Sequence, residues 1–344
     1  MRPRTGLALL LVGAMVFAGG WYFGPAQQPG VAQAMATGKL MFPDLAAHLQ
    51  DAAEVQVANQ GKTLTIRKTG DTWGLAERDG YPVEAEKLRS MLTALTELRL
   101  VEPRTTDPAD YARLGVNDPN AANSTADLLR VLNASGKPIA ELIVGHRRVL
   151  TSGNVPDEVF VRRPNEAQSW LATGSLSVDA DPQLWLVRNI MNIDHARVAH
   201  VAIERDGATL AFDGKDGKLA MTAPAEHPPL DDYKVSELAS GLESLTCDDV
   251  RPGPAPTSGE IGQAVFTTTD GLAVTARLYQ SGKDVLARFA VAGDGKAKAE
   301  AAKLDARVGK WTYQISNWKE AALVPTLADL EAKPEGKPTA GATQ

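Results

Sequence analysis

The sequence is poor in the residues from which covalent and metal-bound sites are usually built. Its 344 residues include one cysteine, Cys247, and five histidines. A single thiol excludes an internal disulfide and a paired-cysteine metal or redox site, so we expect Cys247 to be a buried, unreactive side chain. Neither a phosphate-binding glycine-rich loop nor a G-x-S-x-G motif occurs, which leaves an NTPase or a serine hydrolase without support.

An excess of positive charge is also missing. The formal net charge is −6 and both signs are interspersed, so no basic stripe is present that would neutralise a run of phosphates. We therefore expect no nucleic-acid partner. The hydrophobic fraction of 44% and the charged fraction of 23% are typical of a globular protein. The length is sufficient for two ordinary domains.

The one long apolar run lies near the start of the chain. Arg2 and Arg4 precede residues 6–23, which carry no charge, and the next charged residue is Lys39. A helix of this length rises about 27 Å, close to the roughly 30 Å of a bilayer core. Cationic residues before an apolar run stay in the cytoplasm, which places the rest of the chain on the far side of the membrane. We predict a single-pass signal anchor in residues 1–24 and contact with the membrane through residues 6–23.

A cleaved signal peptide is the alternative explanation of this segment. Small residues that suit a signal peptidase occur at Ala32–Ala34 and Ala34–Ala36, although both lie far beyond the apolar run. The run is longer than the apolar region of an ordinary signal peptide, which favours the uncleaved anchor. Both alternatives predict that the chain is exported.

Two parts of the chain repeat one pattern at a constant distance of 146 positions. Each set alternates apolar and polar residues around a glycine turn, which is typical of a half-buried hairpin followed by a third strand. The first set is Val55–Val57, Gly61, Thr63–Ile66 and Trp73–Leu75, and the second is Val201–Ile203, Gly207, Thr209–Phe212 and Leu219–Met221. The sequence therefore predicts an internal repeat.

The elements expected after each hairpin also correspond. Apolar residues spaced by three and four predict an amphipathic helix after Pro82 and another after Pro228. Each helix is followed by a predicted strand pair, in residues 127–144 and 264–279, and then by a strand and a short helix. These last elements are expected at 159–161 with 166–171, and at 312–314 with 318–323. Asp181 before a proline predicts the N-cap of a helix in 181–190 that connects the two parts.

These patterns predict the α+β class, as two tandem diverged copies of an antiparallel sheet-plus-helix unit behind one N-terminal transmembrane helix. A linker is expected in residues 25–49. We place the first repeat in residues 50–180 and the second repeat, with its connecting helix, in 181–330. The proline- and glycine-rich residues 331–344 are expected to form a disordered tail.

Few residues qualify as candidates for a chemical site. Asp194, His195 and His200 are the nearest approach to a metal cluster, but a spacing of five does not place two imidazoles on one helical face. Asp231–Asp232 and Asp248–Asp249 are paired acids, which we interpret as a helix cap and a polar turn. The other histidines, His48, His146 and His227, are scattered. We therefore assign no catalytic residue, no cofactor-binding residue and no metal ligand.

Several stretches resemble one known family, the domain of unknown function 4340. They are the hairpin that ends at Trp73–Leu75, Pro82 with its helix, the turn Tyr111–Pro119, the strand pair that ends at Leu142–Gly145, the strand Val159–Val161 and the segment Trp185–Arg188. The resemblance covers most of residues 50–325. It implies a bacterial envelope protein with one inner-membrane helix and a periplasmic body. Members often accompany ABC transporter components of the gliding-motility type, and the family brings no catalytic residues.

Three functional hypotheses follow. The first is a non-enzymatic accessory or scaffold subunit of an envelope complex associated with an ABC transporter, with protein partners in the inner membrane or the periplasm. The second is a periplasmic module that binds a small ligand or a glycan in a groove between the repeats. The third, which we favour least, is an envelope hydrolase that uses two facing carboxylates.

Overall fold

The computed structural model describes residues 38–148, 157–215 and 217–332. The predicted membrane-spanning run 6–23 and most of the predicted tail lie outside these residues. Within the described ranges, no helix combines the length and the apolar character that crossing a bilayer requires. Strands predominate, they pair mostly antiparallel, and helices are few, which confirms the predicted α+β class.

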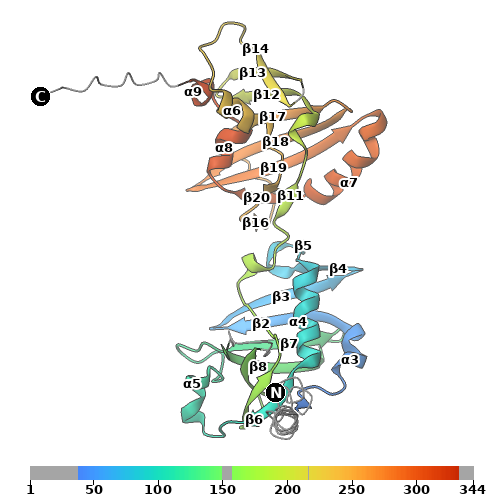
Figure 1. Ribbon diagram of the computed structural model, residues 1–344, viewed down its shortest axis with the longest axis vertical. Coiled ribbons are helices and arrows are strands. Elements are labelled where there is room, and N and C mark those ends of the chain that lie inside the picture. The colour runs from blue at the N-terminus through green and yellow to red at the C-terminus, as the bar shows by residue number, and fades with distance from the viewer. Residues whose placement is uncertain (1–37, 149–156, 216, 333–344) are drawn as a thin grey trace, which may run out of the picture. The chain divides into compact units, whose positions relative to one another are not determined.

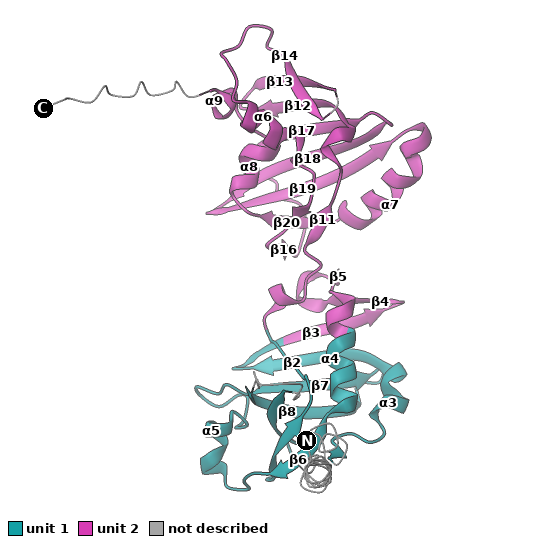
Figure 2. Cartoon of the chain, in the orientation of Figure 1, with its two compact units in different colours: residues 1–63, 89–180 teal, residues 64–88, 181–344 magenta. Residues whose placement is uncertain are grey.

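The chain divides into two compact units (Figure 2). Unit 1 comprises residues 1–63 and 89–180, and unit 2 comprises 64–88 and 181–344. The start positions of three successive strands in 52–75 recur 146 positions later, at Val198, Ala208 and Lys218.

Unit 1 contains the strands β1-β6-β10-β9-β8-β7-β2, in this order, of a ten-stranded antiparallel sheet that continues through β3, β4 and β5. Its strands are β1 Lys39–Leu40, β2 Ala52–Asn59, β6 Arg99–Pro103, β7 Asp127–Asn133, β8 Pro138–Arg148, β9 Glu158–Arg162 and β10 Ser169–Thr173. Its short helices are α3 Leu45–His48, η1 Leu49–Asp51, η3 Pro108–Asp110 and α5 Tyr111–Leu114. The helix predicted after Pro82 is α4, Ala85–Glu97, which lies across the sheet (Figure 1) and buries Leu88, Met91, Leu92 and Leu95.

Two segments of unit 1 differ from the sequence-based expectation. Residues 166–171, predicted as a short helix, instead enter strand β10, where Trp170 pairs with Val161 and Leu171 with Phe160. The prediction was wrong because so short a segment has little helical stability of its own, whereas β9 and β6 both offer it backbone partners. Residues 39–48, inside the expected linker, form β1 and α3 and bury Met41 and Leu45.

The turn Tyr111–Pro119 is held by packing and hydrogen bonds. The α5 helix ends at Gly115, whose φ of +68° favours glycine. A Cβ on Gly145 of β8 would lie 2.4 Å from the Leu114 carbonyl oxygen, so only glycine permits this close approach. Tyr111 donates its hydroxyl to the Ala167 carbonyl at 2.5 Å, and the buried Arg162 guanidinium lies 4.5 Å from the Tyr111 ring centroid.

Unit 2 contains an eight-stranded sheet with strand order β14-β13-β12-β17-β18-β19-β20-β16 and a small two-stranded sheet of β11 and β15. The strands are β11 Asn189–Met191, β12 Val198–Arg205, β13 Ala208–Lys215, β14 Lys218–Ala223, β15 Leu245–Thr246, β16 Asp249–Arg251, β17 Glu260–Thr268, β18 Leu272–Ser281, β19 Asp284–Gly293 and β20 Thr312–Ile315. The helices are η4 Pro182–Leu184, η5 His195–Arg197, α6 Asp232–Ala239, η6 Gly295–Ala297, α7 Lys298–Val308, α8 Trp318–Leu323 and α9 Leu327–Leu330. Earlier in the chain, β3 Lys62–Thr69, which begins in unit 1, leads into β4 Thr72–Leu75, η2 Ala76–Arg78 and β5 Tyr81–Pro82.

The helix predicted in 181–190 is only a single 3₁₀ turn, η4. Asp181 does cap it, because its carboxylate accepts from the Gln183 amide at 3.0 Å. The helix stops there because later backbone groups bond elsewhere: the Trp185 carbonyl accepts from Glu84 at 2.8 Å, and the Val187 amide donates to Pro82 at 3.2 Å. Cross-chain pairing therefore replaces helical hydrogen bonds.

Candidate functional site

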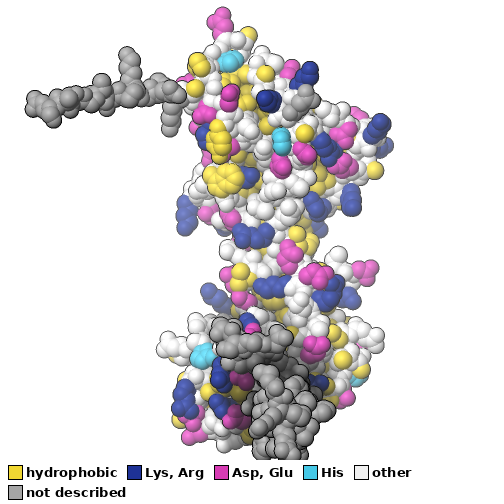
Figure 3. Space-filling model, in the orientation of Figure 1, with side chains coloured by type: hydrophobic (Ala, Val, Ile, Leu, Met, Phe, Trp, Pro, Cys, Tyr) yellow, Lys and Arg dark blue, Asp and Glu magenta, His cyan; other side chains and the backbone are white. Residues whose placement is uncertain are grey.

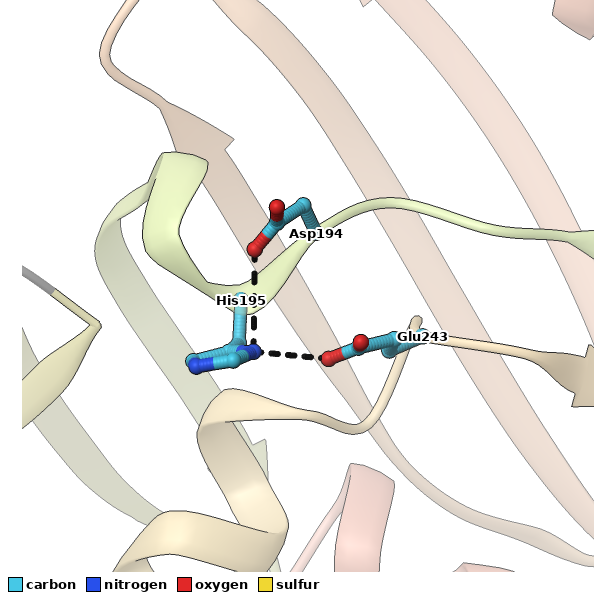
Figure 4. Close-up of side chains that lie close together, drawn as sticks. All are labelled: Asp194, His195 and Glu243. Atoms are coloured by element: carbon cyan, nitrogen blue, oxygen red, sulfur yellow. Dashed lines mark hydrogen bonds and ion pairs between the residues drawn. The ribbon is translucent and has the colours of Figure 1, made fainter.

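Three potential metal-binding side chains of unit 2 converge at one point (Figure 4). The Nδ1 atom of His195 lies 2.7 Å from Oε2 of Glu243 and 3.6 Å from Oδ1 of Asp194. Asp194 and His195 begin the η5 turn, and Glu243 lies in the turn between α6 and β15. Their candidate ligand atoms all lie within 4.8 Å of one another; Asp194 is exposed, whereas His195 and Glu243 are partly buried.

Backbone pairing brings these two distant segments together. Strand β11 pairs with β15 through Asn189 with Thr246 and Met191 with Leu245. Directly beyond it, the Ile193 amide donates to the Leu242 carbonyl at 3.1 Å. The Ser244 amide donates to the Asn192 side-chain carbonyl at 2.8 Å. Asp194 directly follows Ile193, and Glu243 directly follows Leu242. The backbone hydrogen bond between Ile193 and Leu242 therefore fixes the positions from which the Asp194 and Glu243 side chains extend.

Of the three residues predicted in this region, His200 lies apart from Asp194 and His195. It pairs with Asp213 on the neighbouring strand, with 2.8 Å between Nδ1 and Oδ1. Asp194 and His195 stay together, and Asp194 also accepts from the Ala196 amide at 2.8 Å as the cap of η5. Sequence reasoning missed Glu243, which lies 48 positions after His195 and has no local signal that links the two.

The paired acids are used within the fold. Asp231 caps α6 by accepting from the amides of Tyr233 and Lys234, as predicted, and Asp232 opens that helix. Asp248 accepts from Arg188 at 3.0 Å and from the Ser316 hydroxyl at 2.8 Å.

The interpretation of Asp249 as part of a polar turn was wrong. Asp249 is buried in strand β16, and both its oxygens bind the Arg78 guanidinium at 2.9 Å. Burial alone raises the pKa of this carboxyl, but hydrogen bonds from Arg78 and from the Val250 amide outweigh it, so the pKa of Asp249 is lowered. The hydrogen bond to Asp249 correspondingly raises the pKa of Arg78. The acid is therefore held as an ionised partner of arginine.

Cys247 is buried in unit 2, where its charge would act on the buried side chains of Tyr81 and Tyr313. The Tyr81 ring makes edge contacts with Trp311 and Tyr313, at centroid distances of 5.0 and 6.1 Å, and its hydroxyl donates to the Val187 carbonyl at 2.7 Å. Burial raises the pKa of Tyr81 and of Tyr313. Burial also raises the pKa of Cys247 to about 11, so the neutral thiol is favoured. The prediction that Cys247 is buried is confirmed.

The other histidines lie apart from one another. His48 is 3.4 Å from Asp51 and lines a surface hollow of about 410 Å³ in unit 1. His146 lies 3.0 Å from the Thr125 hydroxyl, and His227 lies 2.8 Å from the carbonyl of Pro228.

Unit 2 also exposes two large aromatic side chains on neighbouring helices. Tyr233 of α6 is 67% exposed and Trp318 of α8 is 61% exposed. Lys234 and Lys319 lie over these rings, with Nζ 5.6 and 4.5 Å from the respective centroids. Glu237 links the Tyr233–Lys234 pair to the Trp318–Lys319 pair. It accepts a hydrogen bond from Lys234 at 2.9 Å, and its charge acts on Lys319.

We call these five residues the aromatic face. Figure 3 shows hydrophobic side chains at the surface in the region of α6 and α8. Burial lowers the pKa of Lys319, against the opposing effect of Glu237. Both lysines place their charged ends over the aromatic rings, which is the geometry of a cation–π contact.

Comparison with curated proteins gives no match. The family model described as "Domain of unknown function (DUF4340)" matches residues 73–263, which is more than half of the chain. The matched range contains α4, the turn Tyr111–Pro119, the segment around Trp185 and the Asp194–His195–Glu243 cluster. The chain therefore belongs to the DUF4340 family.

Proposed function

We propose that this protein is a membrane-anchored accessory subunit that works by binding a protein partner outside the cytoplasm. The anchor is the uncharged run 6–23 behind Arg2 and Arg4, which is long enough to cross a bilayer. A tethered body meets its membrane neighbours at a high effective concentration, so a modest contact surface suffices for binding.

The aromatic face is the structural observation that carries the proposal. Trp and Tyr are enriched in protein interfaces, where they supply much of the binding energy. Charges of both signs lie beside the rings, with Glu237 between Lys234 and Lys319. Such a mixture suits a protein surface with complementary charges better than an anionic lipid surface, which selects clustered cations.

The paired acids argue against the hydrolase hypothesis. Glycoside hydrolysis needs two carboxylates that face each other across a substrate. Here Asp231 caps a helix, Asp248 binds Arg188 and Ser316, and Asp249 binds Arg78. Each of these three acids already has a role in the fold, so they offer no facing pair to a hydrolase.

We also propose that the chain arose as two diverged copies of one unit and that only the second acquired this surface. The 146-position offset between strand starts supports the duplication. The position equivalent to Tyr233 by this offset is Lys87. In the predicted pairing of residues 166–171 with 318–323, the position that corresponds to Trp318 is Glu166. The first copy therefore lacks both exposed rings, and partner contact is assigned to the second copy.

The partner that we propose is a subunit of an ABC transporter, because the family that the sequence resembles often accompanies such components. Photo-crosslinking in intact cells tests this. A photoreactive amino acid at Trp318 should give one discrete protein adduct that contains a transporter subunit. The matched control places the same amino acid at Val101, which is 51% exposed in unit 1 and should give no such adduct. Adducts only with lipid, or equal adducts at both positions, would contradict the proposal.

A further inference from the structure

We propose that Asp194, His195 and Glu243 form a binding site for one divalent transition-metal cation, with Zn²⁺ as the probe ion. The inference is independent of the proposed function. It rests on the convergence of three donor atoms, on their charge and on the way in which the main chain fixes them.

The donor set fits such an ion. An imidazole nitrogen and two carboxylate oxygens are ligands that Zn²⁺ accepts, and they would lie about 2.0–2.2 Å from it. Tetrahedral ligands at that range are about 3.3–3.6 Å apart, and Nδ1 of His195 is already 3.6 Å from Oδ1 of Asp194. Glu243, at 2.7 Å from the same nitrogen, must withdraw by less than about 1 Å, a small movement for a partly exposed side chain.

Charge favours a dication at this point. Among the described residues, the ion pairs formed by Asp194 and by Glu243 all involve His195, and none involves a lysine or an arginine. Two carboxylates therefore lie close together beside one imidazole. Arg197, two positions after His195, forms its ion pairs with Asp270 and Glu300, at 2.9 and 3.0 Å. A bound dication would neutralise both carboxylates at once.

The imidazole is held with one edge toward the carboxylates. On its opposite side, a Cβ on Gly217 would approach the His195 Cδ2 atom to 2.8 Å, so glycine leaves just enough room for the ring. Nδ1 points to both acids in Figure 4. The hydrogen bonds from Ile193 to Leu242 and from Ser244 to Asn192 fix the two ligand segments against each other before any ion binds.

Calorimetric titration of the full-length, untagged and chelator-treated protein with Zn²⁺ tests the site. We expect one equivalent to bind, and His195→Gln or Glu243→Gln to weaken binding about 10-fold or more. The matched control is His200→Gln, because His200 and Asp213 form a similar pair with 2.8 Å between Nδ1 and Oδ1 but without a third ligand. This variant should bind Zn²⁺ as the parent does.

A second measurement keeps the result clear if a variant is unstable. At one Zn²⁺ concentration, the rise in Tm should be clearly larger for the parent and for His200→Gln than for Glu243→Gln or Asp194→Asn, because a ligand of the folded state stabilises it in proportion to how tightly it binds. Co²⁺ should give visible absorption bands in the parent that both ligand variants lose. Binding by the parent weaker than about 100 µM, or unchanged binding in the ligand variants, would overturn the assignment.

Discussion

Arg78 and Asp249 form a two-pronged ion pair although 171 positions separate them in the sequence. The Nε–Oδ1 and Nη2–Oδ2 distances are both 2.9 Å, and the two side chains are only 20% and 11% exposed. Within unit 2 this pair fixes η2 against strand β16. The planar fork of arginine matches both oxygens of the carboxylate, which makes such a pair stronger and more specific than a single contact.

Removal of one member of this pair should be costly. Asp249→Asn leaves the Arg78 charge poorly compensated in a largely buried position, so we expect a loss of about 2–4 kcal/mol in the free energy of unfolding. The double variant Arg78→Met with Asp249→Leu should lose clearly less than the sum of the losses of Arg78→Met alone and Asp249→Leu alone, because both charges are then absent. Urea unfolding measures all four variants.

The control for this prediction is Arg113→Met. Arg113 is 78% exposed and lies 3.5 Å from Asp110, so its loss should change stability by under about 0.5 kcal/mol. Equal losses for Asp249→Asn and Arg113→Met would show that the Arg78–Asp249 pair contributes nothing special.

The same pair predicts a pH dependence. Because the folded pKa of Asp249 is lowered, the ion pair stabilises the fold fully above the unfolded pKa of about 3.9. This stability is lost as pH falls below that value and through the folded pKa. Asn does not titrate, so the stability difference between the parent and Asp249→Asn should shrink from neutral pH to about pH 3. Urea midpoints of both proteins over this pH range measure the stability difference. A difference that stays constant would contradict the lowered pKa of Asp249.

Cys247 should be protected from thiol reagents in the folded protein. Its pKa is raised to about 11 from 9.0, so at about pH 8 the folded protein holds about 100-fold less thiolate than the unfolded chain. Burial slows access further. We expect labelling by a thiol reagent to be at least about 100-fold slower in the native protein than in concentrated urea. Comparable rates in the two states would mean that Cys247 is open to solvent.

Gly145→Ala should destabilise unit 1. The added methyl group would lie 2.4 Å from the Leu114 carbonyl oxygen and 2.8 Å from a methyl carbon of Val116, so backbone must shift. We expect a loss of about 1–3 kcal/mol in the free energy of unfolding. Gly282→Ala is the comparison, because its φ of +63° strains an alanine although open space surrounds it, whereas Gly145 is crowded without a left-handed φ. A loss no greater than that of Gly282→Ala would remove the packing explanation.

The sequence predicted the elements whose signals are local. Alternating residues around glycine turns were sufficient for β2–β3 and β12–β13, and spacing of three and four was sufficient for α4. The pattern was insufficient at 166–171 and 181–190, where backbone partners distant in the sequence decide the conformation. Strand β19 and helix α7 were not distinguished in advance, although Val285–Val291 alternates and 298–308 is rich in alanine and lysine.

The candidate site was less accessible to sequence reasoning than the fold. Asp194 and His195 were recognised as a pair, but His200, the nearest histidine, was the wrong third member. Glu243 reaches them only because β11 pairs with β15 and the Ile193 amide bonds to Leu242. The ion pair of Arg78 with Asp249 escaped prediction for the same reason. Contacts that depend on tertiary pairing leave no periodic signal in the chain.

The measurement that tests the central proposal most directly is the membrane topology of the intact protein. Alkaline phosphatase, which is active only outside the cytoplasm, is fused after Ala332, the last described residue. We predict an active, membrane-bound fusion, and loss of activity when Leu10→Arg and Val16→Arg place charges in the apolar run. An inactive fusion of the unaltered chain, produced in equal amount, would contradict the anchored, extracytoplasmic assignment.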